Sequence, residues 1–220
     1  MDKYFLKKII KKILIEEIEN INFEVENYSE KPDCTSGKLK ANNWSDLYNK
    51  LIKLKYISQK TPMLIVWGPT QKMYYTEDGI NLIKDFPIST GKKGFGNEEG
   101  MGKTAIGLMK IARKIQAPEK YQVLVGKKPY NSVLKPNTLS KRIVDGKPHY
   151  AEVTTGLIEL VGLENCNKNT FNRAIYIHGT NLENSLGKPA SGGCVRTKNN
   201  DILWLINNIK NNTYVYVYSS

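Results

Sequence analysis

A chain of 220 residues is long enough for one full hydrophobic core, or for one domain with a small appendage. Its 40% hydrophobic content, with 17 glycines and 9 prolines, is typical of a globular protein and argues against general disorder. The formal net charge of +12 favours an anionic partner, although a lysine-rich solubilising surface would explain it equally well. No helix-turn-helix, RNA-recognition or zinc-finger pattern accompanies the charge, so nucleic acid is not expected as a partner.

The three cysteines, Cys34, Cys166 and Cys194, are too few and too scattered for a disulfide framework. A bond between Cys34 and Cys166 would leave the Cys194 thiol available, as suits an oxidising compartment, but nothing in the sequence shows that this pair forms. The chain has two histidines and no Cys/His spacing typical of zinc sites. We therefore expect no metal.

The first 58 residues are predicted to form a helical extension and a linker. Residues 1–21 repeat isoleucine and leucine with a helical period, and lysines fill the other face. The longest apolar run, at 13–15, is too short for a signal-peptide core or a membrane span. The helix would either lie on an anionic bilayer as a peripheral contact or pack its apolar stripe on protein. A polar linker over 26–42 precedes a short helix over 44–54, with Ser45 as its candidate cap.

From residue 61 the pattern changes to short apolar runs separated by turns, among them a turn at Asp78-Gly79. Strands are expected over 63–67, 73–75, 80–89, 106–111, 152–161, 174–177 and 214–218, and a helix over 199–210 with Asn199 or Asn200 as cap. This pattern predicts a mainly β, α+β fold with flanking helices, in one domain over residues 59–220.

The glycine-rich segment 91–104 ends in Gly102-Lys103-Thr104 and so resembles a phosphate-binding loop. A Walker A loop needs glycine five positions before Gly102, and Asn97 stands there. No nucleotide cofactor is therefore expected, and the segment is interpreted as a loop near the active site.

The stretch from Tyr176 to Arg196 carries the residues with the strongest chemical signal. The apolar run 174–177 predicts a strand that delivers His178 to its exposed end, and Ser191-Gly192-Gly193 predicts a turn directly before Cys194. A cysteine is an effective nucleophile as thiolate, and a neighbouring imidazole can take its proton. The backbone N–H groups of Gly193 and Cys194 would point at an oxyanion, and the following helix would add its dipole. These features predict a cysteine acyl transferase or hydrolase.

The same residues resemble a known family. His178-Gly-Thr followed by Leu-Gly-Lys-Pro-Ala-Ser-Gly-Gly-Cys-Val-Arg at 186–196 is similar to the catalytic signature of the YkuD-type L,D-transpeptidases. The resemblance spans roughly 63–218 and implies the small β-sandwich of that family. One departure stands out: the family usually has histidine where this chain has Gly192.

The resemblance implies attack by Cys194 on peptidoglycan stem peptides, with a thioester intermediate, D-alanine as leaving group and His178 as general base. Transfer to an amine gives L,D-transpeptidation, and transfer to water gives L,D-carboxypeptidase activity. It further implies the following supporting roles: Ser191, Gly192 and Gly193 for the loop and oxyanion, and Arg196, Thr180 and Tyr176 for substrate.

Three alternatives stay open at this stage. A salt bridge to Asp201 would equally explain Arg196. Loss of the usual histidine at Gly192 would suit a catalytically weakened member that binds wall peptides without turnover. Residues 118–150 would form either a lid over the substrate or a plain surface loop, in which His149 is expected to be solvated. The resemblance implies a location in the cell envelope or periplasm, although the chain shows no recognisable signal peptide.

Overall fold

In the computed structural model the chain divides into two units, residues 1–31 and 32–220. The structure describes residues 34–35, 39–100, 102–125 and 152–219, together with the backbone of three short strands between 132 and 149, all within the second unit. The helix expected over 1–21, and with it any membrane contact, lies outside the described residues. The domain boundary at residue 59 stays a prediction.

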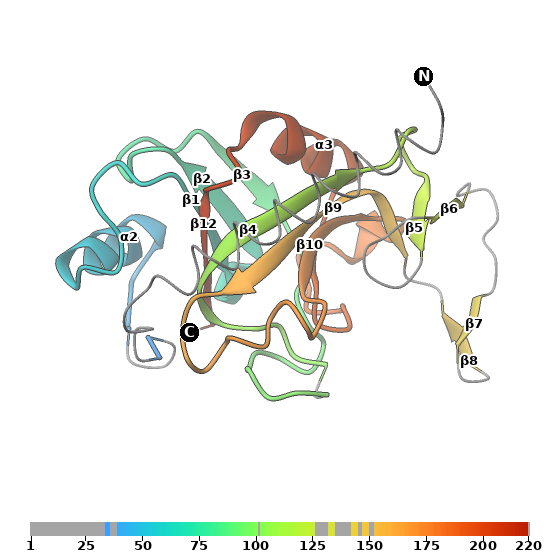
Figure 1. Cartoon of the computed structure of the whole chain (residues 1–220), viewed down its shortest axis with the longest axis horizontal. Coiled ribbons are helices and arrows are strands. Elements are labelled where there is room, and N and C mark those ends of the chain that lie inside the picture. The colour runs from blue at the N-terminus through green and yellow to red at the C-terminus, as the bar shows by residue number, and fades with distance from the viewer. Residues whose placement is uncertain are drawn as a thin grey trace, which may run out of the picture. The chain divides into compact units, whose positions relative to one another are not determined.

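Within the described residues, ten strands form one curled sheet (Figure 1). The main path runs β11-β10-β9-β4-β12-β1-β2-β3, and its strands are β1 (Met63–Trp67), β2 (Lys72–Thr76), β3 (Lys84–Pro87), β4 (Gly107–Gln116), β9 (Val153–Gly162), β10 (Tyr176–Thr180), β11 (Val195–Thr197) and β12 (Tyr214–Tyr218). Off this path, β5 (Val123–Val125) pairs with β9 and with β6 (Ser132–Leu134), and a separate hairpin joins β7 (Arg142–Val144) to β8 (Lys147–His149). The pairs β1–β12 and β10–β11 are parallel.

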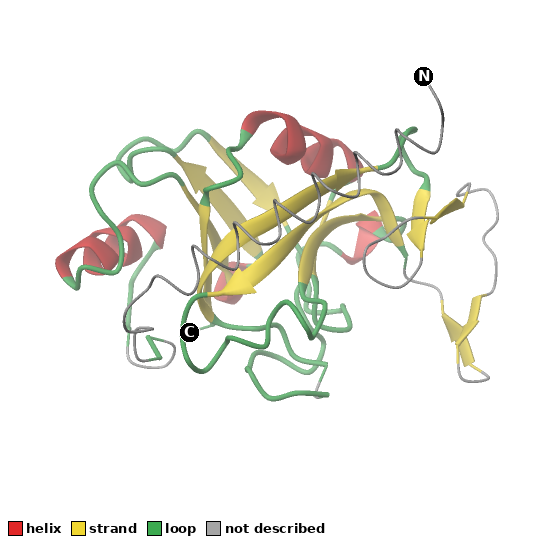
Figure 2. Ribbon diagram, in the orientation of Figure 1, coloured by secondary structure: helices red, strands yellow, loops and turns green. Residues whose placement is uncertain are grey.

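Two α-helices occur in the part of the chain that the structure describes: α2 (Trp44–Lys53) and α3 (Asn199–Asn208). Single turns of 3-10 helix lie at Gly68–Thr70 and Glu183–Ser185. Figure 2 shows the helices beside a much larger area of strand. The prediction of a mainly β fold with flanking helices is confirmed.

The main core lies on one face of the sheet, where α3 packs against β4, β9 and β10. Side chains alternate along a strand, so every second residue of β9, β10 and β11 joins this core, as Ile158, Ile177 and Val195 do. Each of these three side chains is fully buried. The residues between them point to the opposite face, which matters for the active site.

Several predicted boundaries need correction, each for a local reason. The cap of α2 is Asn43 rather than Ser45, because the Asn43 side-chain oxygen accepts the Asp46 N–H at 2.8 Å. The strand expected over 80–89 is only Lys84–Pro87. The carboxylate of Asp78 accepts the backbone N–H groups of Ile80 and Asn81, both at 2.8 Å, and holds that stretch in a turn.

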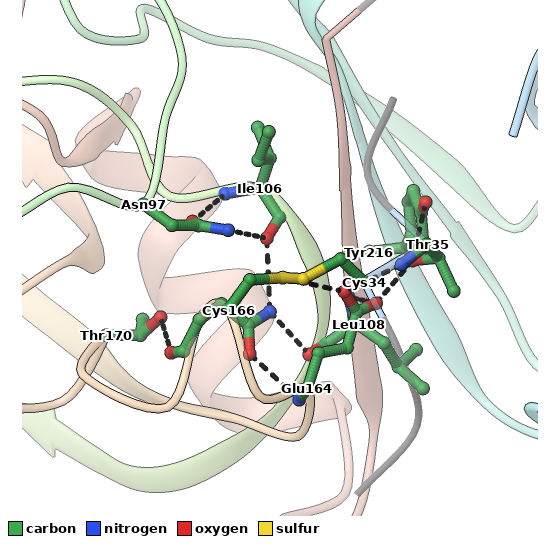
Figure 3. The surroundings of a disulfide bond; sticks show 10 residues. Cys34, Thr35, Asn97, Ile106, Leu108, Glu164, Cys166, Thr170 and Tyr216 are labelled. Carbon is green, nitrogen blue, oxygen red and sulfur yellow. Dashed lines mark hydrogen bonds between the residues drawn. A yellow bond between two sulfur atoms is a disulfide. The ribbon is translucent and has the colours of Figure 1, made fainter. Parts of the chain in front are cut away.

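A disulfide joins Cys34 to Cys166, with 5.7 Å between their Cα atoms (Figure 3). The neighbouring residue Thr35 donates its backbone N–H to the Glu164 carboxylate at 3.0 Å, and Leu108 donates its own at 2.8 Å. Burial raises the pKa of Glu164, while these hydrogen bonds oppose the rise. The disulfide therefore fastens residues 34–35 to the loop after β9, and the hydrogen bonds of Glu164 connect them to the start of β4.

Candidate active site

The predicted functional residues gather on the face of the sheet opposite the main core. In the register of the sheet His178 lies opposite Leu157 of β9 on one side and opposite Arg196 of β11 on the other. Paired residues of neighbouring strands point to the same face, so these three side chains share it. Two residues before Arg196, Cys194 packs with Tyr176 and Leu157 in a second, smaller apolar cluster. We call this surface of β9, β10 and β11 the site face.

His178 lies in the middle of β10, not at an exposed strand end as predicted, and only 5% of its surface is exposed. The strand continues to Thr180 through an irregularity after His178, which explains the difference. Its Nδ1 lies 2.7 Å from the carbonyl oxygen of Gly179. A carbonyl oxygen only accepts, so Nδ1 carries the proton and Nε2 keeps a lone pair. This tautomer is the one that a general base needs.

The pKa of His178 is lowered to about 4, chiefly by burial and to a smaller degree by the positive charge of Arg196, while the bond to Gly179 opposes both. The imidazole is therefore neutral at pH 7. In the unfolded chain a histidine has a pKa near 6.5. Between these two values the unfolded state binds more protons, so stability is fully present above about pH 6.5 and is lost as the pH falls towards 4.

We expect the free energy of unfolding to fall by about 2 kcal/mol between about pH 7.5 and pH 5 through His178 alone. Urea titrations of the wild type and of His178→Gln at both pH values measure this contribution as the difference between the two proteins. Glutamine at position 178 binds no proton in this pH range, whereas the carboxylates contribute equally to the pH dependence of both proteins. An equal pH dependence in the two proteins would show that His178 is not held neutral by the fold.

Cys194 immediately precedes β11 and is diagonal to His178 across the β10–β11 pair. Diagonal neighbours in a sheet lie roughly 7–8 Å apart, with their Cβ atoms somewhat closer, within reach of an imidazole and a thiol that turn towards each other. In this structure the Cys194 sulfur donates to the carbonyl oxygen of Ala174 at 3.3 Å. A sulfur-to-imidazole hydrogen bond stays a prediction.

The turn before Cys194 is fixed by two hydroxyl groups. Ser191 donates its hydroxyl to the Cys194 carbonyl oxygen at 2.5 Å and accepts the Gly193 N–H at 3.1 Å. Thr104 donates to the Gly193 carbonyl oxygen at 2.8 Å and accepts the Gly91 N–H at 2.7 Å. The sequence predicts that the Gly193 N–H points at an oxyanion. In this conformation it is instead bound to the Ser191 hydroxyl and does not point into such a site. For the Cys194 N–H that role stays a prediction.

The two glycines of the turn should respond differently to substitution. A Cβ on Gly192 meets nothing within 4 Å, and its φ lies outside the left-handed region. Gly193 has a φ of +133°, and its Cβ would lie 3.1 Å from the Lys103 carbonyl oxygen.

We therefore expect Gly192→His to leave stability within roughly 0.5 kcal/mol of the wild type, and Gly193→Ala to cost on the order of 1–2 kcal/mol. A histidine at 192 should also raise the acylation rate by about tenfold, if its imidazole reaches the oxyanion. Urea titration measures the change in stability, and single-turnover acylation measures the change in rate. Equal destabilisation by the two substitutions would contradict this account of the turn.

Arg196 is 93% buried, since only 7% of its surface is exposed. Its Nη1 donates to the Ala190 carbonyl oxygen at 3.3 Å, and its backbone pairs with Ser89. The alternative of a salt bridge to Asp201 is wrong, because that carboxylate pairs with Lys84 at 3.5 Å. Arg196 and Asp201 lie on different elements, and the strand β11 turns the guanidinium to the site face.

The sequence predicts that the dipole of the helix after Cys194 stabilises the thiolate, and the structure does not support this. The three residues of β11 and the cap residue Lys198 separate the two, roughly 13 Å of extended chain, and a helix dipole acts only over the first turn. Neither predicted cap holds: Lys198 occupies the cap position without a side-chain bond. Glu183 instead accepts the Asn199 N–H at 2.8 Å.

The remaining predicted substrate residues are buried in this structure. Tyr176 is 1% exposed and belongs to the smaller apolar cluster, and Thr180 is fully buried with its hydroxyl accepting the Leu182 N–H at 3.1 Å. Their contact with substrate stays a prediction. The side chain of His149 lies outside the described residues, as does most of 118–150.

Among the described residues, one group of three potential metal ligands lies close together: Cys34, Glu164 and Cys166. Its two sulfurs form the disulfide, so the group belongs to that bond. No helix in the described part of the chain is long and apolar enough to cross a membrane.

Sequence reasoning missed three groups that hold the site. They are the Gly179 carbonyl oxygen that sets the His178 tautomer, the Ala174 carbonyl oxygen that accepts from the thiol, and the Thr104 hydroxyl. The first two are backbone atoms, which no residue type signals. Thr104 closes the glycine-rich segment at Gly102-Lys103-Thr104, and that is its one signal in the sequence.

Comparison with protein families finds a match over residues 62–217 to the model of the YkuD, L,D-transpeptidase catalytic domain. This range covers more than half of the chain. The chain belongs to the YkuD family of L,D-transpeptidase catalytic domains. Comparison with curated protein sequences finds no match.

Solved structures similar to this family member include three L,D-transpeptidases. The protein from Mycobacterium smegmatis is 13% identical, with 73% of this chain and 59% of that chain covered and a TM-score of 0.45. The one from Xylanimonas cellulosilytica is 14% identical, with coverage of 78% and 69% and a TM-score of 0.43. A mutant of the Enterococcus faecium protein is 16% identical, with coverage of 74% and 50% and a TM-score of 0.44. The chain thus spans less than two thirds of the Mycobacterium and Enterococcus structures.

Proposed function

We infer that this protein is a cysteine-dependent L,D-transpeptidase of peptidoglycan stem peptides, in which Cys194 is the nucleophile and His178 the general base. The observation that carries the proposal is the 2.7 Å contact between Nδ1 of His178 and the Gly179 carbonyl oxygen, from which the tautomer follows. A buried, neutral imidazole with its Nδ1 proton bound to Gly179 has an Nε2 lone pair to offer, on the same face as a thiol that directly precedes the adjacent strand. A binding module has no chemical need for such a base beside a thiol.

In the proposed first step the Cys194 sulfur attacks the carbonyl carbon of the amide before the terminal D-residue. The thiol proton passes to Nε2 of His178 as the carbon–sulfur bond forms. When the tetrahedral intermediate collapses, the carbon–nitrogen bond breaks and His178 returns that proton to the departing amine. A thioester on Cys194 remains, and D-alanine leaves.

In the second step an amine of another stem peptide attacks the thioester, and His178 takes the proton that this amine loses. The carbon–sulfur bond breaks, and the proton returns to the sulfur. Water in place of the amine gives L,D-carboxypeptidase activity by the same route. No step calls for a metal or a cofactor.

The disulfide between Cys34 and Cys166 supports a site of action in the envelope or periplasm, since such bonds persist in oxidising compartments. The family's peptidoglycan substrate points to the same place. Peripheral membrane contact by residues 1–21 remains part of the proposal, and nucleic acid is not among the proposed partners.

The test is incubation of the protein with a purified stem tetrapeptide, followed by mass spectrometry of the products. The proposal predicts release of D-alanine together with a cross-linked dimer or a tripeptide, and no release by the matched variant Cys194→Ser. Tetrapeptide binding by the wild type without any release would instead support the non-enzymatic wall-binding module that Gly192 suggested.

A further inference from the structure

Arg196 carries a buried charge that pairs with no carboxylate among the described residues. Arginine is almost never fully buried unless it is paired, because desolvation of an isolated charge is costly. Within the described part of the chain, its side chain has one bond, to the Ala190 carbonyl oxygen at 3.3 Å. Arg113, by contrast, pairs with the Glu159 carboxylate at 2.9 Å. The guanidinium of Arg196 therefore calls for an anion on the site face.

The sheet register identifies where that anion would form. Arg196 is the direct cross-strand neighbour of His178 in β10, and it follows Cys194 by two residues on the same face. His178 and Cys194 are related only diagonally. Arg196 is thus the cation next to both members of the proposed pair, and the Cys194 sulfur is the group beside it that becomes negative.

We propose that Arg196 is the counter-ion of the Cys194 thiolate, a role usually given to an imidazolium. This deepens the proposed function and rests on it for the identity of the nucleophile. The guanidinium stabilises the negative sulfur and at the same time disfavours a charged His178. At a pH near the thiol midpoint, part of the protein rests as a thiolate paired with Arg196. The rest keeps the thiol, from which the neutral imidazole takes the proton as the sulfur attacks.

The charges around the two side chains agree with this assignment. Burial lowers the pKa of Arg196, and the nearby Cys194 opposes that shift. Burial, and to a smaller degree the same guanidinium, lowers the pKa of His178, so the histidine is neutral and cannot be the resting counter-ion. Among the described residues, the other titratable or charged groups on neighbouring elements include Glu159 with Arg113, Tyr176, Arg173, Lys103 and Glu152.

These other groups do not replace Arg196 as counter-ion. Glu159 is already paired with Arg113, and the pair lies one strand further from Cys194. Arg173 donates to the Gly96 and Lys103 carbonyl oxygens, and the Lys103 ammonium pairs with Glu98 at 3.5 Å.

The test measures the thiol without any peptide, so that failure of the proposed function does not affect it. The rate of Cys194 alkylation by iodoacetamide is followed against pH for the wild type, Arg196→Met and Arg196→Lys. Lys188→Met serves as matched control, because it removes one positive charge from an exposed position in the loop that leads to Ser191. Circular dichroism and thermal melting establish that each protein is folded.

We expect a wild-type midpoint at least one pH unit below the ordinary value of about 8.5. Arg196→Met should raise this midpoint by about one unit or more, which slows alkylation at neutral pH about tenfold. Arg196→Lys should recover most of the shift, because it keeps the charge, and Lys188→Met should leave the midpoint unchanged. If Arg196 only filled space in the fold, Arg196→Lys and Arg196→Met would have the same alkylation midpoint.

Two results would overturn the proposal. One is a wild-type midpoint near 8.5, which decides the matter even if Arg196→Met does not fold. The other is an unchanged midpoint in a folded Arg196→Met; a raised KM of that variant for the tetrapeptide would then assign Arg196 to the substrate carboxylate.

Discussion

Replacing His178 with glutamine is expected to reduce single-turnover acylation of Cys194 by roughly a hundredfold to ten-thousandfold at neutral pH, the range that general-base catalysis supplies. Glutamine is chosen because its amide can still donate to the Gly179 carbonyl oxygen, as Nδ1 does at 2.7 Å. The buried position is then filled and its backbone partner kept, but the basic lone pair is gone. The measurement is rapid-quench acylation with a stem tetrapeptide.

The chain offers a matched control, because His149 is its other histidine. The variant His149→Gln should keep most of the wild-type rate. Loss of activity in the His149 variant, with the His178 variant active, would mean that the base has been assigned to the wrong residue. Recovery of the His178→Gln rate at high pH would support the assignment further, since a thiolate formed by solvent does not need the base.

Removing the disulfide is expected to lower the free energy of unfolding by roughly 2–5 kcal/mol. Cys34 and Cys166 are 132 residues apart in sequence, so the bond restricts a large part of the unfolded chain. In the folded state it also places Thr35 against the buried Glu164 carboxylate, where Tyr216 donates its hydroxyl to the Thr35 oxygen at 3.0 Å (Figure 3). The measurement is urea unfolding of the double variant Cys34→Ala with Cys166→Ala.

Two controls separate the bond from the side chains. The wild type under a reducing agent should lose about as much stability as the double variant, whereas Cys194→Ser should lose little. An unchanged midpoint in the double variant would show that the bond adds nothing to the folded domain. Reduction of the disulfide should not change which of the wild type, His149→Gln and His178→Gln is acylated faster, because the disulfide lies outside the site face.

The sequence predicted the elements that depend on local pattern. The bounds of β1 and β12 match the apolar runs 63–67 and 214–218, because a continuous apolar run between turn residues has few other local solutions. The start of the α2 helix was also found, although its cap was placed two residues too late. There the choice between Asn43 and Ser45 depends on which oxygen reaches the Asp46 N–H, and both residue types are good caps.

The site was predictable as a set of residues but not as an arrangement. The spacing of His178 and Cys194 indicated a shared task, yet local pattern does not reveal that β10 and β11 run parallel and place Arg196 opposite the imidazole. Burial of His178 follows from contacts with β9, which is distant in sequence. The hydroxyl of Thr104 reaches Gly193 from 89 residues away. Such long-range contacts are set by the whole sheet, so no single stretch of sequence contains them.

The most direct test of the central claim is the intact mass of the protein after brief exposure to a stem tetrapeptide, followed by peptide mapping. Acyl transfer through Cys194 predicts a mass increase equal to the mass of the tetrapeptide minus the mass of free D-alanine, which carries away the thiol hydrogen. The adduct should map to the peptide that contains Cys194, be released by hydroxylamine as a thioester is, and be absent in Cys194→Ser. An adduct on another residue, or D-alanine release by Cys194→Ser at the wild-type rate, would contradict the account.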